Sequence, residues 1–410
     1  VVSSSRSNQE SAVTSSSHSP STQAAPAVSV GAKQLNLSRL SGSEREICLR
    51  LAASGIATTV TGRPMATDPD VLSEFVQSIV MGAFVTLKRG KLLRACCGVL
   101  GKPMAVGPAI SSAAIRTARE DQRAAPISPC ELAFLDLEVT LLGPFKKVES
   151  SGRARADAVT VGKHGVMIQR GQNSGLLLPS VATERGWDNV RFLCAVCQKA
   201  GLPTDAWQKD NTVLLIFEGL SIHRPLPELL PDGLPNSVPT PLNLDQVAAY
   251  SQVAGQNIAA IASGATPSYI VPELPDMAVN ALVLSLLWGE DGQSLVESQS
   301  RVFQGNAIQV SFRPGVALQS SLFQMSQHAA SLFARQNFAG QLKVGLTLGF
   351  DPAMHGYGAN VDFSGVDTRQ RAVVVSDSRH CGIAFNPEKT AGELLDLLRG
   401  LMPAGSREGA

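Results

Sequence analysis

The stretch Leu92-Leu-Arg-Ala-Cys-Cys-Gly-Val-Leu100 decides how the first half of this sequence folds. It follows the alternating run Ala83–Lys88, which is typical of a strand, and the segment Arg89–Lys91, whose central glycine is typical of a turn. Together these segments predict a β-hairpin. Because successive side chains of a strand point to opposite faces, we expect Arg94 and Cys96 to share one face of the returning strand.

This hairpin has two interpretations. In the first, Arg94 lowers the pKa of Cys96 and favours a nucleophilic or redox-active thiolate. In the second, Cys96 and Cys97 are buried packing residues, as free cysteines often are, and Arg94 is paired with a carboxylate. The sequence leaves both open.

Helices and strands alternate irregularly around the hairpin. Ser41 and Glu44 have the spacing of a capping box, so a helix should begin there. A strand is expected at Leu135–Leu142, where leucine and valine alternate. Further helices are expected within 68–79, 105–119 and 187–200, and further strands within 159–169 and 212–219.

The pattern of the second half predicts a further region in which helices and strands are mixed. Helices are expected at 244–262, 322–335 and 390–401, and strands at 308–312, 344–350 and 372–375. The absence of a regular βαβ rhythm favours the α+β class in both halves. Ala113–Arg119 resembles Ala329–Arg335, and each is followed by an alternating strand, so the second half is either a degenerate copy of the first or an unrelated domain.

Composition predicts the domain boundaries. Residues 1–38 are rich in serine and contain no aromatic residue, which predicts a disordered tail or linker. The chain starts at Val1 rather than methionine, so an upstream domain is one explanation. Residues 225–241 are dense in proline and predict a linker between domains at 39–224 and 242–410.

The charge balance and the hydropathy of the sequence argue against nucleic acid and a membrane as binding partners. Lys+Arg total 35 against Asp+Glu 34, which gives no basic footprint for nucleic acid. The longest apolar run, Ala278–Trp288, is far shorter than the about 20 residues that a membrane-spanning helix needs. Seven cysteines in 410 residues do not resemble a disulfide scaffold, so we expect a reducing, cytoplasmic location.

Three other features are candidates for chemistry. Cys194-x-x-Cys197 lies within a predicted helix and is either core packing or half of a zinc site, completed by Cys96, Cys97 or His164. His164 precedes a glycine. It is either a functional residue that acts as an acid, a base or a ligand, or a turn residue without such a role. Glu138 is either a solvated strand residue or a partner for Arg94 or His164. No phosphate-binding loop is present, and no cofactor is predicted.

Seven ordered blocks between residues 41 and 222 resemble the AMMECR family. Ala95 and Cys97 stand where the family motif Leu-Arg-Gly-Cys-Ile-Gly has glycine and isoleucine, whereas Arg94, Cys96 and Gly98 match it. The blocks are Gly82–Leu87, Leu93–Gly98, Leu135–Thr140, Gly162–Gly165, Gly175–Ala182, Gly186–Trp187 and Cys197–Pro203.

The resemblance implies a two-lobed α+β domain, with an antiparallel sheet, flanking helices and a cleft between the lobes. Bacterial members resemble one component of a three-part system that includes a Memo-like protein and a radical S-adenosylmethionine enzyme. The first hypothesis is therefore a catalytic or accessory component of a redox-linked modification system. Its cleft would be lined by Arg94, Cys96, Glu138 and His164. Arg94 would bind an anionic group, Cys96 would supply a thiolate, and His164 would move protons. The second hypothesis is a non-catalytic interaction module in which the Arg-Cys-Gly hairpin is structural.

Overall fold

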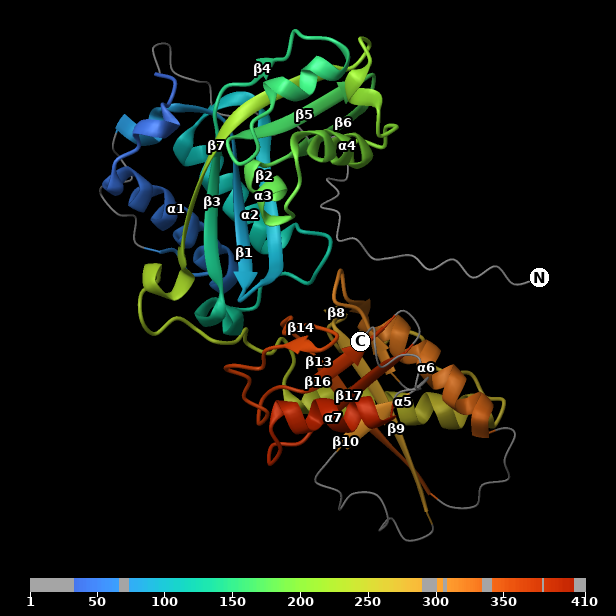
Figure 1. Cartoon of the computed structure of the whole chain (residues 1–410). Helices are drawn as coiled ribbons and strands as arrows, with labels where there is room; N and C mark the ends of the chain where they lie inside the picture. The colour runs from blue at the N-terminus through green and yellow to red at the C-terminus, as the bar shows by residue number, and fades with distance from the viewer. Residues whose placement is uncertain are drawn as a thin grey trace, which may run out of the picture.

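The computed structural model describes residues 33–65, 74–289, 301–304, 308–333, 341–377 and 380–401. Figure 1 shows helices and antiparallel sheets in both halves of the chain, so the predicted α+β class is confirmed. Within the described residues, every helix is too short or too polar to cross a lipid bilayer.

A four-stranded antiparallel sheet forms the larger lobe of the first half. Its strands lie in the order β2 (Leu92–Ala105), β1 (Ile79–Arg89), β3 (Asp136–Leu142) and β7 (Val213–Pro225). The first two strands are the predicted hairpin, and β2 is an edge of the sheet.

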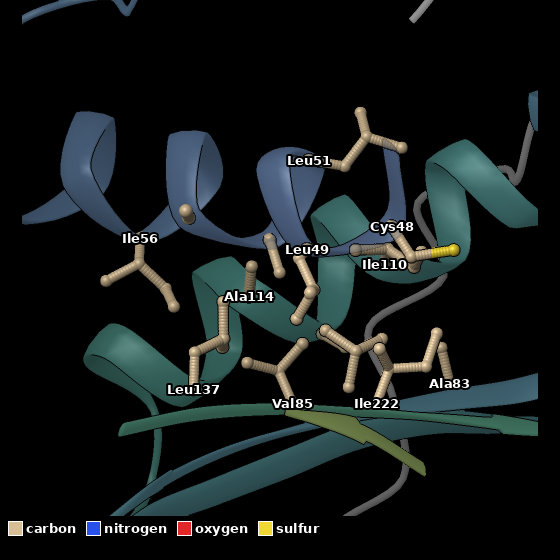
Figure 2. Packing of buried hydrophobic residues seen from close by; sticks show 14 of the residues in the cluster. Cys48, Leu49, Leu51, Ile56, Ala83, Val85, Ile110, Ala114, Leu137 and Ile222 are labelled. Carbon is tan, nitrogen blue, oxygen red and sulfur yellow. The ribbon is translucent and has the colours of Figure 1, made fainter. Parts of the chain in front are cut away.

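Two helices, α1 (Gly42–Thr61) and α2 (Val106–Arg119), cover one face of this sheet. The predicted capping box starts α1, because Ser41 and Glu44 each bond the other's backbone. Figure 2 shows how alternate strand residues point at the helices. The shared core includes Cys48, Leu49, Leu51, Ile56, Ala83, Val85, Ile110, Ala114, Leu137 and Ile222.

The long strand β7 joins this lobe to a smaller one. Its residues 219–225 pair with β3, and its residues 213–218 pair with β5 (His164–Arg170). The smaller lobe adds β4 (Lys146–Lys147), β6 (Asn173–Leu177), α3 (Pro179–Glu184) and α4 (Asn189–Lys199), with its own core around Phe192 and Trp207. Short 3-10 helices lie at Leu37–Arg39, Glu74–Gln77, Pro129–Phe134, Gly152–Ala158, Ala206–Gln208 and Leu226–Leu229.

Three boundaries differ from the expectations. Residues 33–38, predicted as part of the tail, are ordered: Gln34 forms a β-bridge with Ile79 and Leu37 is buried; the rest of the predicted tail lies outside the described residues. The predicted helix within 68–79 is a 3-10 helix at Glu74–Gln77, and residues 68–73 are not described. The proline-rich segment begins inside the fold, because Leu226 is completely buried in the first core.

The second half contains a further α+β domain. One sheet, in the order β11-β9-β13, shares a core with α5 and α6, and another, in the order β10-β17-β16, packs against α7. The elements are α5 (Leu244–Ala262), β8 (Ala278–Val279), β9 (Ala281–Gly289), β10 (Arg301–Gln304), β11 (Ile308–Val310), β12 (Val316–Ala317), α6 (Leu318–Phe333), β13 (Gln341–Gly349), β14 (Gly356–Tyr357), β15 (Asn360–Val361), β16 (Val373–Ser376), β17 (Cys381–Phe385) and α7 (Ala391–Leu401).

The two halves share a topology. In the first, β1 lies between β2 and β3, α2 follows β2, and α1 packs on α2. In the second, β9 lies between β11 and β13, and α5 packs on α6, but two short strands of other sheets are inserted: β10 between β9 and β11, and β12 between β11 and α6. The degenerate duplication stays a prediction, and this repeated order of elements supports it.

Candidate functional site

A row of polar side chains crosses the face of the larger sheet that points away from α1 and α2. Cys96 on β2 pairs with Thr86 on β1, which pairs with Glu138 on β3, which pairs with His223 on β7. Directly paired residues of antiparallel strands share a face. The neighbours of these residues along each strand, such as Val85 and Ala95, belong to the helix-covered core, so the row lies on the opposite face.

Contacts within the row join it to the smaller lobe. The Thr86 hydroxyl donates to Cys96 Sγ at 3.2 Å. Lys88 Nζ lies 3.1 Å from Glu138 Oε2 and 4.0 Å from Glu184 Oε1, and Glu184 ends α3. An ammonium group therefore lies between carboxylates of both lobes.

Side chains that follow α2 fix the backbone of β2 at Cys96. The Cys96 amide donates to Asp121 Oδ2 at 2.8 Å, and Arg123 donates to the Cys96 carbonyl at 3.1 Å. Arg123 and Asp121 also bond each other, at 2.8 Å between Nε and Oδ1. Because β2 is an edge strand, these groups replace the missing neighbouring strand and hold Cys96 in a set position.

Burial sets the protonation states of the thiol and of a lysine from α4. Burial raises the pKa of the Cys96 thiol above its ordinary value, against the smaller lowering effects of Thr86 and Arg123. Burial also lowers the pKa of Lys199 to about 8, and Lys199 lies within electrostatic reach of Cys96 and Arg123. At neutral pH the thiol is protonated, while about one tenth of Lys199 is a neutral amine that can accept a proton.

Comparison with known proteins identifies the first half of the chain. The AMMECR1 family model matches residues 49–222. A protein from Thermococcus gammatolerans is 38% identical over 178 residues, which cover 42% of this chain and 86% of the relative. This chain belongs to the AMMECR1 family.

Other relatives show the same extent of similarity. A protein from Methanothermobacter thermautotrophicus is 37% identical over 188 residues, 45% of this chain and 96% of the relative. The crystal structure of an uncharacterised protein from Pyrococcus horikoshii is 34% identical and covers 45% of this chain and 93% of that one, with a TM-score of 0.42. Residues beyond 222 lie outside the match to the AMMECR1 model.

The structure gives Arg94 a different position from the one expected in the first interpretation. Its guanidinium lies 2.5 Å and 2.8 Å from the two carboxylate oxygens of Glu131, and it donates to the carbonyls of Ala125 and Pro126. Arg94 is 4% exposed and Glu131 is completely buried. Arg94 therefore anchors the AMMECR1 hairpin, and it neither lowers the pKa of Cys96 below its ordinary value nor is free to bind an anion.

His164 is not brought to the polar row. It begins β5, where it pairs with Glu218, and its Nδ1 accepts from the Thr160 amide at 3.1 Å. Its pKa is lowered by burial and by Lys163. Of the four site residues that the AMMECR resemblance implies, Cys96 and Glu138 therefore lie in the row, and the other two do not. The histidine of the row is His223.

The cysteines of α4 lie in the core of the smaller lobe. Cys197 is completely buried, and Cys194 packs against the same cluster. Among the described residues, no group of three metal-ligating side chains is found, so the zinc alternative has no further ligands in that part of the chain.

Sequence reasoning missed Thr86, Lys88, His223 and Lys199. Lys199 is the last residue of α4 and lies within the Cys197–Pro203 block that resembles the family. Thr86 and Lys88 alternate with apolar residues along β1, which marks them as residues of the opposite face. That signal gives the face of each residue but not its neighbours from other strands.

The raised pKa of Cys96 predicts slow alkylation at neutral pH. Since only the thiolate reacts, iodoacetamide labelling of Cys96 in the native protein should accelerate about tenfold per pH unit from pH 7 to 9. Mass spectrometry of the labelled peptide gives the rate, with the urea-unfolded chain as the reference. Fast labelling at pH 7 that does not change with pH would contradict this protonation state.

Proposed function

We propose that the polar row is a catalytic site in which Cys96 is the nucleophile and Lys199 is the base. The observation that carries the proposal is the assembly of Cys96, Thr86 and Glu138 on one sheet face. Lys199, whose pKa is lowered to about 8, lies within electrostatic reach of Cys96. A half-buried protonated thiol needs a proton acceptor, and we assign this role to the neutral amine of Lys199.

Other residues of the row position these two groups. Thr86 orients Sγ through its hydroxyl, and Asp121 and Arg123 fix the backbone of Cys96. Proton transfer from Sγ to Lys199 Nζ produces a thiolate–ammonium pair. The thiolate then attacks an electrophilic carbonyl carbon of the substrate, the bond from that carbon to its leaving group breaks, and the Lys199 ammonium returns the proton to the leaving group. Lys88 and Glu138 form an ion pair in the same row as Cys96. Their two charged groups are positioned to bind polar groups of the substrate.

The proposal includes the partners that family resemblance implies. We infer that the chain is a component of a redox-linked modification system and acts with a Memo-like protein and a radical S-adenosylmethionine enzyme. The support is the resemblance of the first half to bacterial members of such systems. Co-purification of the three proteins from the same organism tests this part separately from the chemistry of Cys96.

Replacing Cys96 or Lys199 should abolish most of the activity. In the reconstituted three-protein system, Cys96→Ala should lower turnover about 10³-fold or more, and Lys199→Met about 10²–10⁴-fold. Activity of the wild type should rise as the pH increases to about 8 and then level off, because Lys199 then loses its proton. The residual activity of Lys199→Met should instead keep rising by about tenfold per pH unit beyond pH 8, because it depends on the Cys96 thiolate alone. Intact-protein mass under single-turnover conditions should show an adduct on Cys96.

Cys97→Ala is the matched control. Cys97 is the next residue on β2, is not part of the row, and its pKa is raised by burial to about 11. Its replacement should leave turnover close to the wild-type value. Unchanged turnover in both Cys96→Ala and Lys199→Met would overturn the catalytic proposal.

A non-catalytic interaction module is the second candidate, favoured by the buried Arg94–Glu131 pair, which makes part of the motif structural. In that case Cys96 serves packing alone. Cys96→Ser should then lower the free energy of unfolding by roughly 1–3 kcal/mol, because a hydroxyl replaces a half-buried thiol, and partner binding should be kept. Urea unfolding and a pull-down with the Memo-like protein distinguish this outcome from loss of turnover.

A further inference from the structure

Two partly buried polar contacts hold the further domain against the AMMECR1 domain. Arg89, at the end of β1, lies 3.0 Å from Asp362 Oδ2 and donates to the Ser364 carbonyl at 2.9 Å. Its side chain is only 4% exposed and lies over the Phe134 ring. Gly365 packs so closely on that ring that an added Cβ would lie 2.2 Å from it. The geometry between the domains is therefore set by specific contacts.

The second contact centres on Asp351. Its Oδ2 accepts from the Ser128 hydroxyl at 2.9 Å and from Arg371 at 2.6 Å. Ser128 belongs to the AMMECR1 domain, while Asp351 and Arg371 belong to the further domain. The Arg371 guanidinium neutralises the Asp351 carboxylate at the interface.

A cavity of about 510 Å³ lies beside this contact, between the two domains. One wall comes from the ends of α1 and α2 and the segment after α2, and the other from residues around Asn280, Phe312 and Asp351. Its volume is within the range of about 300–1,000 Å³ that is typical of small-molecule sites. Because its second wall lies beyond the residues that match the AMMECR1 family, the cavity requires both domains.

The lining combines positive charge with apolar surface. Arg119 and Arg313 contribute two guanidinium groups. Arg119 donates one hydrogen bond to the Thr59 carbonyl, and Arg313 donates one to the Arg119 carbonyl. The buried Nε of Arg313 has no hydrogen-bond partner among the described residues. Most of the other lining residues are apolar, namely Val60, Pro126, Ile127, Val238, Phe312, Pro314 and Pro352, and the polar ones are Thr59, Asn280 and Asp351.

We propose that this interdomain cavity binds a small organic anion with a planar apolar body, of the aromatic carboxylate class. Guanidinium groups bind carboxylates through paired charge-assisted hydrogen bonds, and Arg119 and Arg313 bring two such groups to this cavity. Phe312, 39% exposed at this wall, and the neighbouring prolines offer flat apolar surface for a ring. Asp351, the acidic residue of the lining, is neutralised by Arg371 and does not cancel the charge of the two arginines.

Benzoate and benzyl alcohol are the probes, because they share a ring and differ in charge. In ligand-observed NMR titrations of the full chain, benzoate should bind at least about tenfold more tightly than benzyl alcohol. Arg313→Gln and Arg119→Gln should each weaken benzoate binding by about tenfold or more, while the affinity for benzyl alcohol changes by less than about twofold. Arg153→Gln, at an exposed arginine outside the cavity, is the matched control and should change neither affinity.

Circular dichroism and thermal unfolding show whether each variant is folded. The two arginines lie on different domains, so a folding defect in one variant leaves the other as a test. Equal binding of benzoate and benzyl alcohol, or benzoate binding unchanged in both variants, would overturn the proposal. Inorganic phosphate that binds as tightly as benzoate would also overturn it, because the apolar walls would then contribute nothing.

Discussion

Replacement of Arg94 by alanine is expected to lower the free energy of unfolding of the first domain by about 3–5 kcal/mol. The Arg94 guanidinium binds both oxygens of Glu131 and two backbone carbonyls. Glu131 is completely buried, so alanine at position 94 leaves a carboxylate in the interior with no opposite charge. The penalty arises from this unpaired charge more than from the loss of attraction.

Urea unfolding followed by circular dichroism measures this effect. Arg50→Ala is the matched control, because Arg50 and Glu46 form a half-exposed pair one helical turn apart, which should contribute only about 0.3–0.5 kcal/mol. The double variant Arg94→Met/Glu131→Leu removes both charges and should recover a large part of the lost stability. A loss of less than about 1 kcal/mol in Arg94→Ala would show that the pair is not buried in solution.

Gly165→Ala is expected to destabilise the smaller lobe by about 2–3 kcal/mol. Gly165 on β5 pairs directly with Phe217 on β7, and an added Cβ would lie 2.2 Å from Phe217 Cζ. The ring cannot move aside easily, because Phe217 is 1% exposed and packs edge-on against Phe145 at 5.0 Å. Close-packed interiors respond to such overpacking with strain.

Thermal and urea unfolding of the full chain test this prediction. Gly42→Ala is the control, because the Cβ position of Gly42, at the start of α1, has no atom within 4 Å. That substitution should be neutral or stabilising by up to about 1 kcal/mol. If the clash is the cause, Phe217→Leu should cost less in the Gly165→Ala background than in the wild type, and additive losses would contradict it.

Local patterns in the sequence predicted most elements of the first domain. The capping box at Ser41 and Glu44 starts α1, and the glycine at position 90 marks the turn between β1 and β2. These signals work because they depend on neighbours within a few residues. The tail and the proline-rich segment were predicted less well, since Leu37 and Leu226 are buried by contacts with distant strands and helices.

The candidate site was only partly predictable. Alternation separated Cys96 from Cys97 on β2, and the strand pairing then placed Cys96 and Glu138 on the same face of the sheet. Alternation alone cannot say which lysine or histidine lies nearby. His164 is prominent in the sequence but pairs with Glu218, whereas His223 joins the row through β7. Lys199, at the end of α4, lies within electrostatic reach of Cys96.

The sequence by itself determined the α+β class, the hairpin with Cys96, and the similarity that places the first half in the AMMECR1 family. Only the tertiary structure decided that Arg94 forms an ion pair with Glu131 and does not lower the pKa of Cys96. It also decided that burial raises the pKa of the Cys96 thiol and lowers the pKa of Lys199. The physical reason is that burial and charge pairing depend on groups far apart in the chain. The strand register and the packing of the lobes bring those groups together, and no local pattern encodes these distances.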